Sequence, residues 1–153
     1  MSRAAYLLDT SVVLELVRSK ELARRISAQF DLEHAVHRPL ISVVSVGELM
    51  ALAAYKEWGE GKRRFFAGML DTLVVVDINH QSVLEAYVQL YVVSRKAGSA
   101  IRQSNDLWIA ATAKAASAVL LTTDRDFLVF QTGDVAVQYL GPDLSAPAGE
   151  AAP

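Results

Sequence analysis

The sequence predicts an α/β fold in which helices cover both faces of a mainly parallel sheet. Short apolar runs alternate with longer segments of helical periodicity along most of the chain. Several runs are rich in Val, Ile and Leu, as in strands that are buried on both faces. With 153 residues, 52% hydrophobic and 21% charged, the chain is long and apolar enough for one domain around one core.

The first part of the chain predicts two strands separated by two helices. The connection before the second strand is polar and carries two histidines. The second strand is rich in β-branched residues, which favour extended backbone. The expected elements are a strand at 5–8, helices at 11–18 and 21–30, a connection at 31–39 and a strand at 40–44.

The remainder of the chain continues the alternation and ends in a tail. Apolar residues near period 3.6 mark the long helix at 81–96. The tail is rich in Ala, Pro, Gly and Ser, so we expect a single domain over 1–140 and a disordered segment over 141–153. The other expected elements are helices at 45–58, 62–71 and 105–117, breaks at 59–61 and 97–104, and strands at 73–77, 118–121 and, at a sheet edge, 135–140.

Composition excludes several classes of protein. The chain contains no cysteine, which rules out disulfides and thiolate chemistry and fits a reducing compartment. The apolar start ends at Asp9, too early for a signal peptide, and no uncharged apolar run approaches the ~20 residues that span a bilayer. We therefore expect a cytoplasmic protein with no membrane segment.

The net charge of −2 gives no support by itself to nucleic-acid binding. If a metal neutralised five acids, the remaining charge would be −2 + 5 = +3. Basic residues also cluster, and the clusters could guide a phosphate backbone or could be solvated helix faces; both readings stay open. The clusters are Arg18, Lys20, Arg24 and Arg25; Lys62, Arg63 and Arg64; and Arg95, Lys96 and Arg102.

Four acidic residues lie where strands give way to helices. Asp9, Glu48 and Asp124 follow expected strands, and Asp106 opens an expected helix. Active sites in open parallel sheets collect at the carboxyl ends of the strands. Carboxylates gathered there repel one another unless they bind a cation or take up protons. Hydroxyls accompany them, so a site for Mg²⁺ or Mn²⁺, which prefer oxygen ligands, is the leading hypothesis. The hydroxyl residues are Thr10, Ser11, Ser45, Thr122 and Thr123.

Each acid also has an alternative role as a helix cap. Ser45 and Glu48 fit the S-x-x-E capping box, and Asn105 could cap the helix that contains Asp106. Asp124 and Asp126 could cap a short turn, whereas Thr10 and Ser11 could cap the first helix without Asp9. Capping does not explain why acids mark the ends of three strands together, so the combination favours a shared site.

Other chemistries find less support in the sequence. Nucleotide-binding glycine loops and the G-x-S-x-G elbow are absent. The three histidines, His34, His37 and His80, lack the spacing of a metal site and are expected at the surface. Trp108 and Ile109 are expected in the core, and Tyr87 and Tyr91 share one helix face suited to packing or a subunit interface.

Four segments resemble the successive motifs of PIN-domain nucleases, and more narrowly of VapC toxins. They are LLDTS (7–11), SVGEL (45–49), NDLWIAA (105–111) and LTTDRDF (121–127), and they occur in the family's order. The resemblance implies a three-layer sandwich with a mainly parallel five-stranded sheet. It also implies divalent-metal-dependent RNA cleavage with Mg²⁺ or Mn²⁺, homodimerisation and a VapB-like antitoxin partner.

Matched position by position, the resemblance assigns the site residues. Asp9, Glu48, Asp106 and Asp124 match the catalytic, metal-binding acids, and Asp126 follows close behind Asp124 as a further or indirect metal ligand. Ser11 and Thr122 match supporting hydroxyls. Arg102 and Arg125 are candidates for phosphate contacts because of their position beside the acids.

Three rival functions remain open at this point. The chain could be a PIN nuclease of RNA processing, or of DNA flaps, rather than a toxin. A phosphotransfer domain would need an Asp-x-Asp after the first strand, which Asp9-Thr10-Ser11 does not supply. A non-enzymatic binding domain would show no manganese-dependent stabilisation. Neither the RNA that is cut nor the number of metal ions follows from the sequence.

Overall fold

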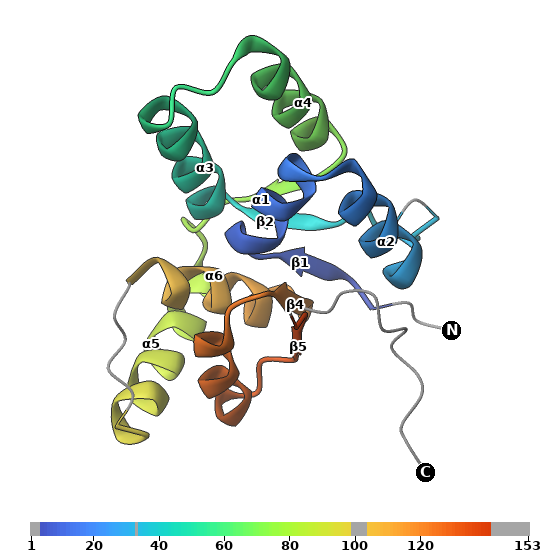
Figure 1. The fold of residues 1–153 in the computed structure, drawn as a ribbon. Coiled ribbons are helices and arrows are strands. Elements are labelled where there is room, and N and C mark those ends of the chain that lie inside the picture. The colour runs from blue at the N-terminus through green and yellow to red at the C-terminus, as the bar shows by residue number, and fades with distance from the viewer. Residues whose placement is uncertain (1–3, 33, 99–103, 142–153) are drawn as a thin grey trace.

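The computed structural model describes residues 4–32, 34–98 and 104–141. These residues form a five-stranded sheet, all parallel, in the order β3-β2-β1-β4-β5. The sheet lies between helices, which confirms the predicted α/β class (Figure 1). Arg102 and the segment 142–153, which holds most of the predicted tail, lie outside the described residues. The strands are β1 (Tyr6–Leu8), β2 (Leu40–Ser42), β3 (Val74–Val76), β4 (Val119–Thr122) and β5 (Val137–Tyr139).

Helices connect the strands in the order expected for crossover connections in a parallel sheet. The longest, α5, runs from Gln81 to Lys96 as predicted, because its apolar residues keep the helical period throughout. The helices are α1 (Thr10–Arg18), α2 (Lys20–Phe30), α3 (Val43–Tyr55), α4 (Glu60–Asp71), α5 (Gln81–Lys96), α6 (Ser104–Ala115) and the 3₁₀-helix η1 (Arg125–Gly133).

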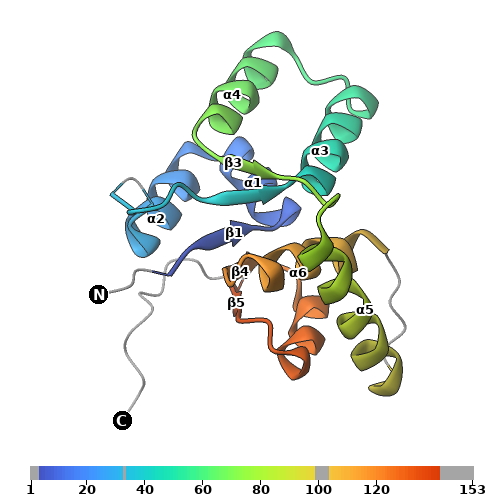
Figure 2. The ribbon, with the colours of Figure 1, turned by 180° about the vertical axis from the view of Figure 1, so that it is seen from behind.

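Two layers of helices cover the two faces of the sheet. Helices α1 to α4 lie on one side and α5, α6 and η1 on the other, as both ribbon views show (Figures 1 and 2). Neighbouring strand residues point to opposite sides: Leu7 and Leu120 pack with α5 and α6, whereas Leu8 and Leu121 pack with α1 and α3. The central strands β1 and β4 are therefore buried on both faces, which explains their apolar sequences, whereas Val74 and Val75 of the edge strand β3 are exposed.

Strand ends differ from the prediction by one or two residues, and one difference concerns the site. The predicted strand 40–44 ends at Ser42, and Val43 begins helix α3. The Ser42 hydroxyl accepts a hydrogen bond from the backbone N–H of Val44 at 3.2 Å and so caps the helix. The prediction was wrong because the β-branched Val43 and Val44 were counted as strand, although a serine cap precedes them.

Two further corrections concern helix starts. Helix α6 begins at Ser104, so Asn105 lies within the helix and is not its cap. The turn expected before Phe127 is the first part of η1, which continues to Gly133.

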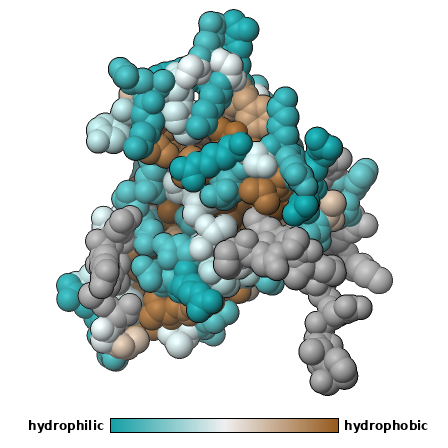
Figure 3. Space-filling model, in the orientation of Figure 1, coloured by the Kyte–Doolittle hydropathy of each residue, from teal (hydrophilic) through white to brown (hydrophobic). Residues whose placement is uncertain are grey.

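Among the described residues, no helix has the length and apolar character to cross a membrane. On the face shown in Figure 3, hydrophilic residues cover much of the surface and hydrophobic residues fill gaps between them.

Candidate functional site

The predicted site lies at the carboxyl edge of the sheet, where the strand order changes direction. From β1 the chain adds β2 and β3 on one side, and then β4 and β5 on the other. The junction between β1 and β4 is therefore the topological switch point, where open α/β sheets bind ligands. Asp9 directly follows β1, and Asp124 lies two residues after the end of β4.

Asp9 is buried and held by three hydrogen bonds. Its Oδ1 accepts from the backbone N–H of Thr10 at 2.7 Å. Its Oδ2 accepts from the Ser11 hydroxyl at 2.7 Å and from the Thr122 hydroxyl at 2.8 Å. Only 4% of the residue is exposed. Asp9 is thus the cap of α1, and the alternative that Thr10 and Ser11 cap this helix without it is wrong.

Burial raises the pKa of Asp9, and the charge of Glu48 adds to this effect. The three hydrogen bonds from Ser11, Thr122 and Thr10 lower the pKa of Asp9 but do not reverse the rise. The carboxylate is therefore oriented by the protein while its charge is only partly compensated.

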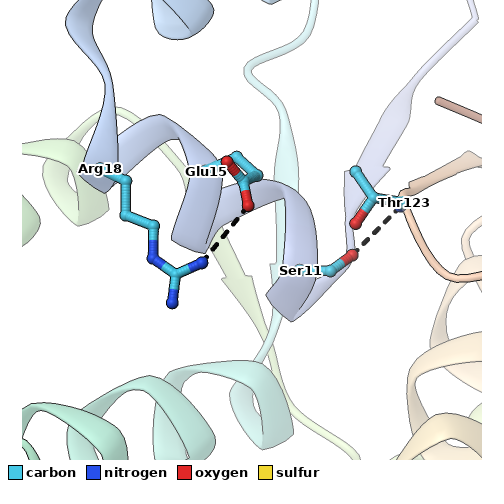
Figure 4. A network of polar contacts seen from close by, with 4 residues as sticks. All are labelled: Ser11, Glu15, Arg18 and Thr123. Carbon is cyan, nitrogen blue, oxygen red and sulfur yellow. Dashed lines mark hydrogen bonds and ion pairs between the residues drawn. The ribbon is translucent and has the colours of Figure 1, made fainter. Parts of the chain in front are cut away.

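The two hydroxyls that hold Asp9 also tie it to the turn after β4. The Thr122 hydroxyl accepts from the backbone N–H of Asp124 at 3.0 Å, and the Ser11 hydroxyl accepts from that of Thr123 at 3.1 Å. Figure 4 shows Ser11 directed toward Thr123, whereas the Glu15–Arg18 ion pair lies farther along α1. The supporting role predicted for Ser11 and Thr122 therefore has a geometric basis.

Glu48 lies in the second turn of α3 and faces the start of α1. Its Oε1 is 2.9 Å from the Thr10 hydroxyl, which is also 2.8 Å from the Ser45 hydroxyl. Because Ser42 caps α3, Ser45 already lies inside the helix, and the capping-box alternative for Glu48 is wrong. Glu48 is instead linked to the carboxyl edge of the sheet by its hydrogen bond with the Thr10 hydroxyl. From the sequence, Thr10 was expected only as a hydroxyl that accompanies the acids.

Asp106, in the first turn of α6, has a strongly raised pKa. Burial, and then the charges of the other four acids of the site, raise its pKa from 3.8 to about 7. Those four acids are, in order of effect, Asp9, Asp124, Glu48 and Asp126. No described residue donates a hydrogen bond to the Asp106 side chain. The other three predicted catalytic acids and Asp126 therefore all lie near enough to Asp106 for their charges to act on it.

Asp124 and Asp126 lie at the start of η1. Asp124 caps this helix, because its Oδ1 accepts from the backbone N–H of Asp126 at 2.9 Å. The capping alternative is thus confirmed for Asp124, and its charge acts on Asp106 at the same time. The exposed Arg125 lies over the ring of Tyr139 on β5, with its Cζ 5.2 Å from the ring centroid.

The donor set fits a hard divalent cation by its chemistry. Carboxylate and hydroxyl oxygens surround the switch point, and the crowding of negative charge raises the pKa of Asp106. As the side chains stand, no three His, Asp or Glu residues within the described ranges form a group arranged to hold an ion. Side-chain movement would therefore be needed to bring three of these acids around one ion.

The remaining candidates from the sequence have structural roles. Among the histidines, His80 caps α5 by accepting from the Ser82 N–H at 3.2 Å. Ile109 is buried, and the half-buried Trp108 packs on Tyr87 with ring centroids 4.0 Å apart. Tyr87 also stacks on Tyr91, which is itself exposed, so packing within the chain accounts for Tyr87 but not for all of this helix face.

Comparison with known proteins places these observations in a family. A model of the PIN domain matches residues 6–131. A comparison with curated protein sequences gave no significant match. Solved structures with the same fold include VapBC2 from Rickettsia felis bound to a DNA fragment from their promoter, at 19% identity and a TM-score of 0.73. That alignment covers 88% of this chain and 98% of the other.

Two further structures give similar values. FitAcB from Neisseria gonorrhoeae has 25% identity and a TM-score of 0.68, covering 86% of this chain and 95% of that one. VapBC-1 from nontypeable Haemophilus influenzae has 24% identity and a TM-score of 0.68, covering 88% and 97%. The family match extends over most of the chain and includes all five acids of the site. The chain therefore belongs to the PIN domain family, as its sequence motifs indicated.

Proposed function

We propose that this protein is a divalent-metal-dependent endoribonuclease and the toxin of a type II toxin–antitoxin pair, acting in the cytoplasm. PIN domains are in general nucleases, which hydrolyse phosphodiester bonds. The observation that carries the proposal is the convergence of Asp9, Glu48, Asp106, Asp124 and Asp126 at the switch point of the sheet. The likeness to VapBC and FitAcB structures supports the toxin assignment over RNA processing.

In this proposal Asp9, Glu48, Asp106 and Asp124 hold Mg²⁺ or Mn²⁺, with Asp126 beside them. A bound divalent ion would supply Lewis-acid chemistry at a phosphate oxygen and lower the pKa of a water. The protein's part is to fix Asp9 through Ser11, Thr122 and the Thr10 N–H, so that the Asp9 carboxylate itself needs little reorganisation when an ion binds. Hydrolysis adds water across the P–O bond, and no side-chain nucleophile is required.

Arg125 is the described candidate for a phosphate contact. Arg125 lies between Asp124 and Asp126 in the sequence. Its guanidinium lies over the ring of Tyr139 and contacts the Tyr139 hydroxyl, so its position is partly fixed. A cation there would offset the repulsion between the RNA backbone and the acids. Arg102 keeps the same proposed role from its place in the sequence.

The activity is tested by incubating purified protein with total RNA and Mn²⁺ and mapping the cut ends. Asp9→Asn keeps the shape of the side chain and removes its charge. Cleavage should fall by about 100-fold or more, which corresponds to about 2.7 kcal/mol of lost transition-state stabilisation. Asp71→Asn, an exposed change at the end of α4, should cleave as the parental protein does. Parental cleavage by Asp9→Asn would refute the assignment.

Metal binding has a separate test that needs no substrate. A ligand that binds only the folded protein stabilises it, by about 2.7 kcal/mol at 100 times its dissociation constant. Mn²⁺ should therefore raise the unfolding temperature of the parental protein and have little effect on Asp9→Asn. An equal rise in both proteins would mean that the ion binds elsewhere.

The toxin role and the partners are tested in cells. Expression should arrest growth, and coexpression of a VapB-like protein encoded beside the gene should restore it, whereas Asp9→Asn should not arrest growth. Light scattering of the purified protein would test the proposed homodimer. Growth without arrest, together with RNA cleavage in vitro, would favour a PIN nuclease of RNA processing.

A further inference from the structure

Thr10 contacts two of the proposed metal ligands at once. Its backbone N–H donates to Asp9 Oδ1 at 2.7 Å, and its side-chain hydroxyl lies 2.9 Å from Glu48 Oε1. Asp9 and Glu48 come from different elements, the end of β1 and the helix α3, and are 39 positions apart in the sequence. One residue at the start of α1 therefore contacts both carboxylates.

The direction of the hydrogen bonds follows from the number of protons. The Thr10 hydroxyl has one proton and two close oxygen neighbours, Glu48 Oε1 and the Ser45 hydroxyl at 2.8 Å. An ionised carboxylate can only accept, so Thr10 donates to Glu48 and accepts from Ser45. Successive hydrogen bonds of this kind polarise one another and strengthen the last one.

The helix geometry of α3 supports this arrangement. Ser45 and Glu48 are three residues apart and lie on the same face of the helix. Ser45 is 0% exposed, so water does not compete for its hydroxyl. Within the described residues, every buried side-chain polar atom has a hydrogen-bond partner. The chain Ser45–Thr10–Glu48 is thus a complete polar network between α1 and α3.

We propose that the Thr10 hydroxyl is a positioning group that fixes Glu48 beside Asp9 and so prepares both carboxylates for a divalent ion. Ser45 acts through Thr10 by orienting the hydroxyl proton. This inference rests on the proposed function, because it assigns Asp9 and Glu48 to the same metal. Groups that orient metal ligands in this way commonly change metal affinity by about 10- to 100-fold when removed.

The test is the Mn²⁺ affinity of variants, measured by calorimetry without RNA. Thr10→Val removes the hydroxyl, keeps the side-chain shape and leaves the backbone N–H to Asp9 in place; its dissociation constant should rise by about 10-fold or more. Thr10→Ser restores the hydroxyl and should bind within about threefold of the parental protein. Ser45→Ala leaves the bond from Thr10 to Glu48 and should lose less than Thr10→Val does.

Thr112→Val is the matched control. Thr112 is fully buried, as Ser45 is, and its hydroxyl donates to the backbone oxygen of Trp108 at 2.8 Å, within α6. This variant should lower stability without weakening Mn²⁺ binding. If Thr10→Val lowered stability but kept the parental Mn²⁺ affinity, Thr10 would be a structural residue only and the inference would be wrong.

Two further outcomes separate this inference from the proposed function. If Asp9→Asn bound Mn²⁺ as tightly as the parental protein, the proposed metal site itself would be refuted. If Asp9→Asn lost binding while Thr10→Val did not, only the role of Thr10 would fail. If Thr10→Val does not fold, Ser45→Ala replaces it in the test. A rise of about threefold or more in the dissociation constant of Ser45→Ala for Mn²⁺ would support the network. Parental Mn²⁺ affinity of Ser45→Ala would refute it.

Discussion

The β1–β4 junction and the start of α6 both present a partly or fully buried acid, but they treat it in opposite ways. At the junction, three hydrogen bonds hold Asp9 and partly offset the effect of burial on its pKa. At the start of α6, Asp106 has no hydrogen-bond donor among the described residues, and four neighbouring charges add to the effect of burial. The protein thus stabilises one carboxylate by itself and leaves the other dependent on a proton or a cation.

The two acids therefore have different expected roles in the site. Asp9 is fixed before any ion arrives, because the hydroxyls of Ser11 and Thr122 join it to the turn after β4. Asp106, with a pKa of about 7, is partly protonated near neutral pH in the metal-free protein. A divalent ion would replace that proton, so metal binding should release protons and should tighten as pH rises.

The largest expected effect on stability comes from removing the Asp9 carboxylate at the β1–β4 junction. Asp9→Ala leaves three donors without their acceptor, at a cost of about 1–3 kcal/mol for each buried unsatisfied group, and water filling the space reduces the total. We expect the free energy of unfolding of the metal-free protein to fall by about 3 kcal/mol. Urea unfolding measures this, with the exposed Asp71→Ala as control; a change below 0.5 kcal/mol would mean that the hydrogen bonds do not hold Asp9 in solution.

The opposite sign is expected at α6. Asp106→Asn removes a carboxylate that burial and four like charges disfavour, so the metal-free protein should become more stable at pH 8. Because the group is partly accessible to solvent, the gain should be about 1–2 kcal/mol. The same variant should lose the stabilisation by Mn²⁺. A loss of stability at pH 8 would remove the contrast between the two regions.

The pH dependence provides a sharper form of the same contrast. The pKa of Asp106 in the folded protein lies above 3.8, so the folded state binds this proton more tightly than the unfolded chain does. Stability from this group is therefore present below pH 3.8 and is lost as pH rises to about 7. The difference in stability between Asp106→Asn and the parental protein should grow over that range, by at most about 1.4 kcal/mol per pH unit. A constant difference would contradict the raised pKa.

The smallest effect is expected for Thr122→Val. This variant removes one of the two hydroxyls on Asp9 Oδ2 and the acceptor of the Asp124 N–H, while Ser11 and Thr10 remain. The free energy of unfolding should fall by about 1 kcal/mol, and the pKa of Asp9 should rise further because a bond that lowers it is lost. Thr112→Val again serves as the buried-hydroxyl control.

The sequence predicts best those features that depend on local periodicity. Helix α5 was predicted from Gln81 to Lys96 because its apolar residues repeat without interruption. Around Ser42 two local preferences conflict, since Val43 and Val44 favour a strand while Ser42 can cap a helix, and packing of α3 on the sheet decides the outcome. The full length of the 3₁₀-helix η1 was not predicted, because its apolar residues show no clear helical period.

The acids of the site could be predicted because strand ends in a parallel sheet meet at one edge. Their individual roles could not be predicted from spacing alone. The contact from Thr10 to Glu48 joins residues 38 positions apart and depends on how α1 packs against α3. Likewise the raised pKa of Asp106 results first from burial and then from four charges on three other segments, which only the folded chain brings near.

The most direct measurement is a carboxyl ¹³C NMR titration of Asp106, with and without Mg²⁺. If burial and the four neighbouring carboxylates act on Asp106 as described, its titration midpoint in the metal-free protein should lie near pH 7. The midpoint should fall markedly when Mg²⁺ is present. A midpoint near the ordinary value of 3.8 without metal, unchanged by Mg²⁺, would show that these side chains do not share one site.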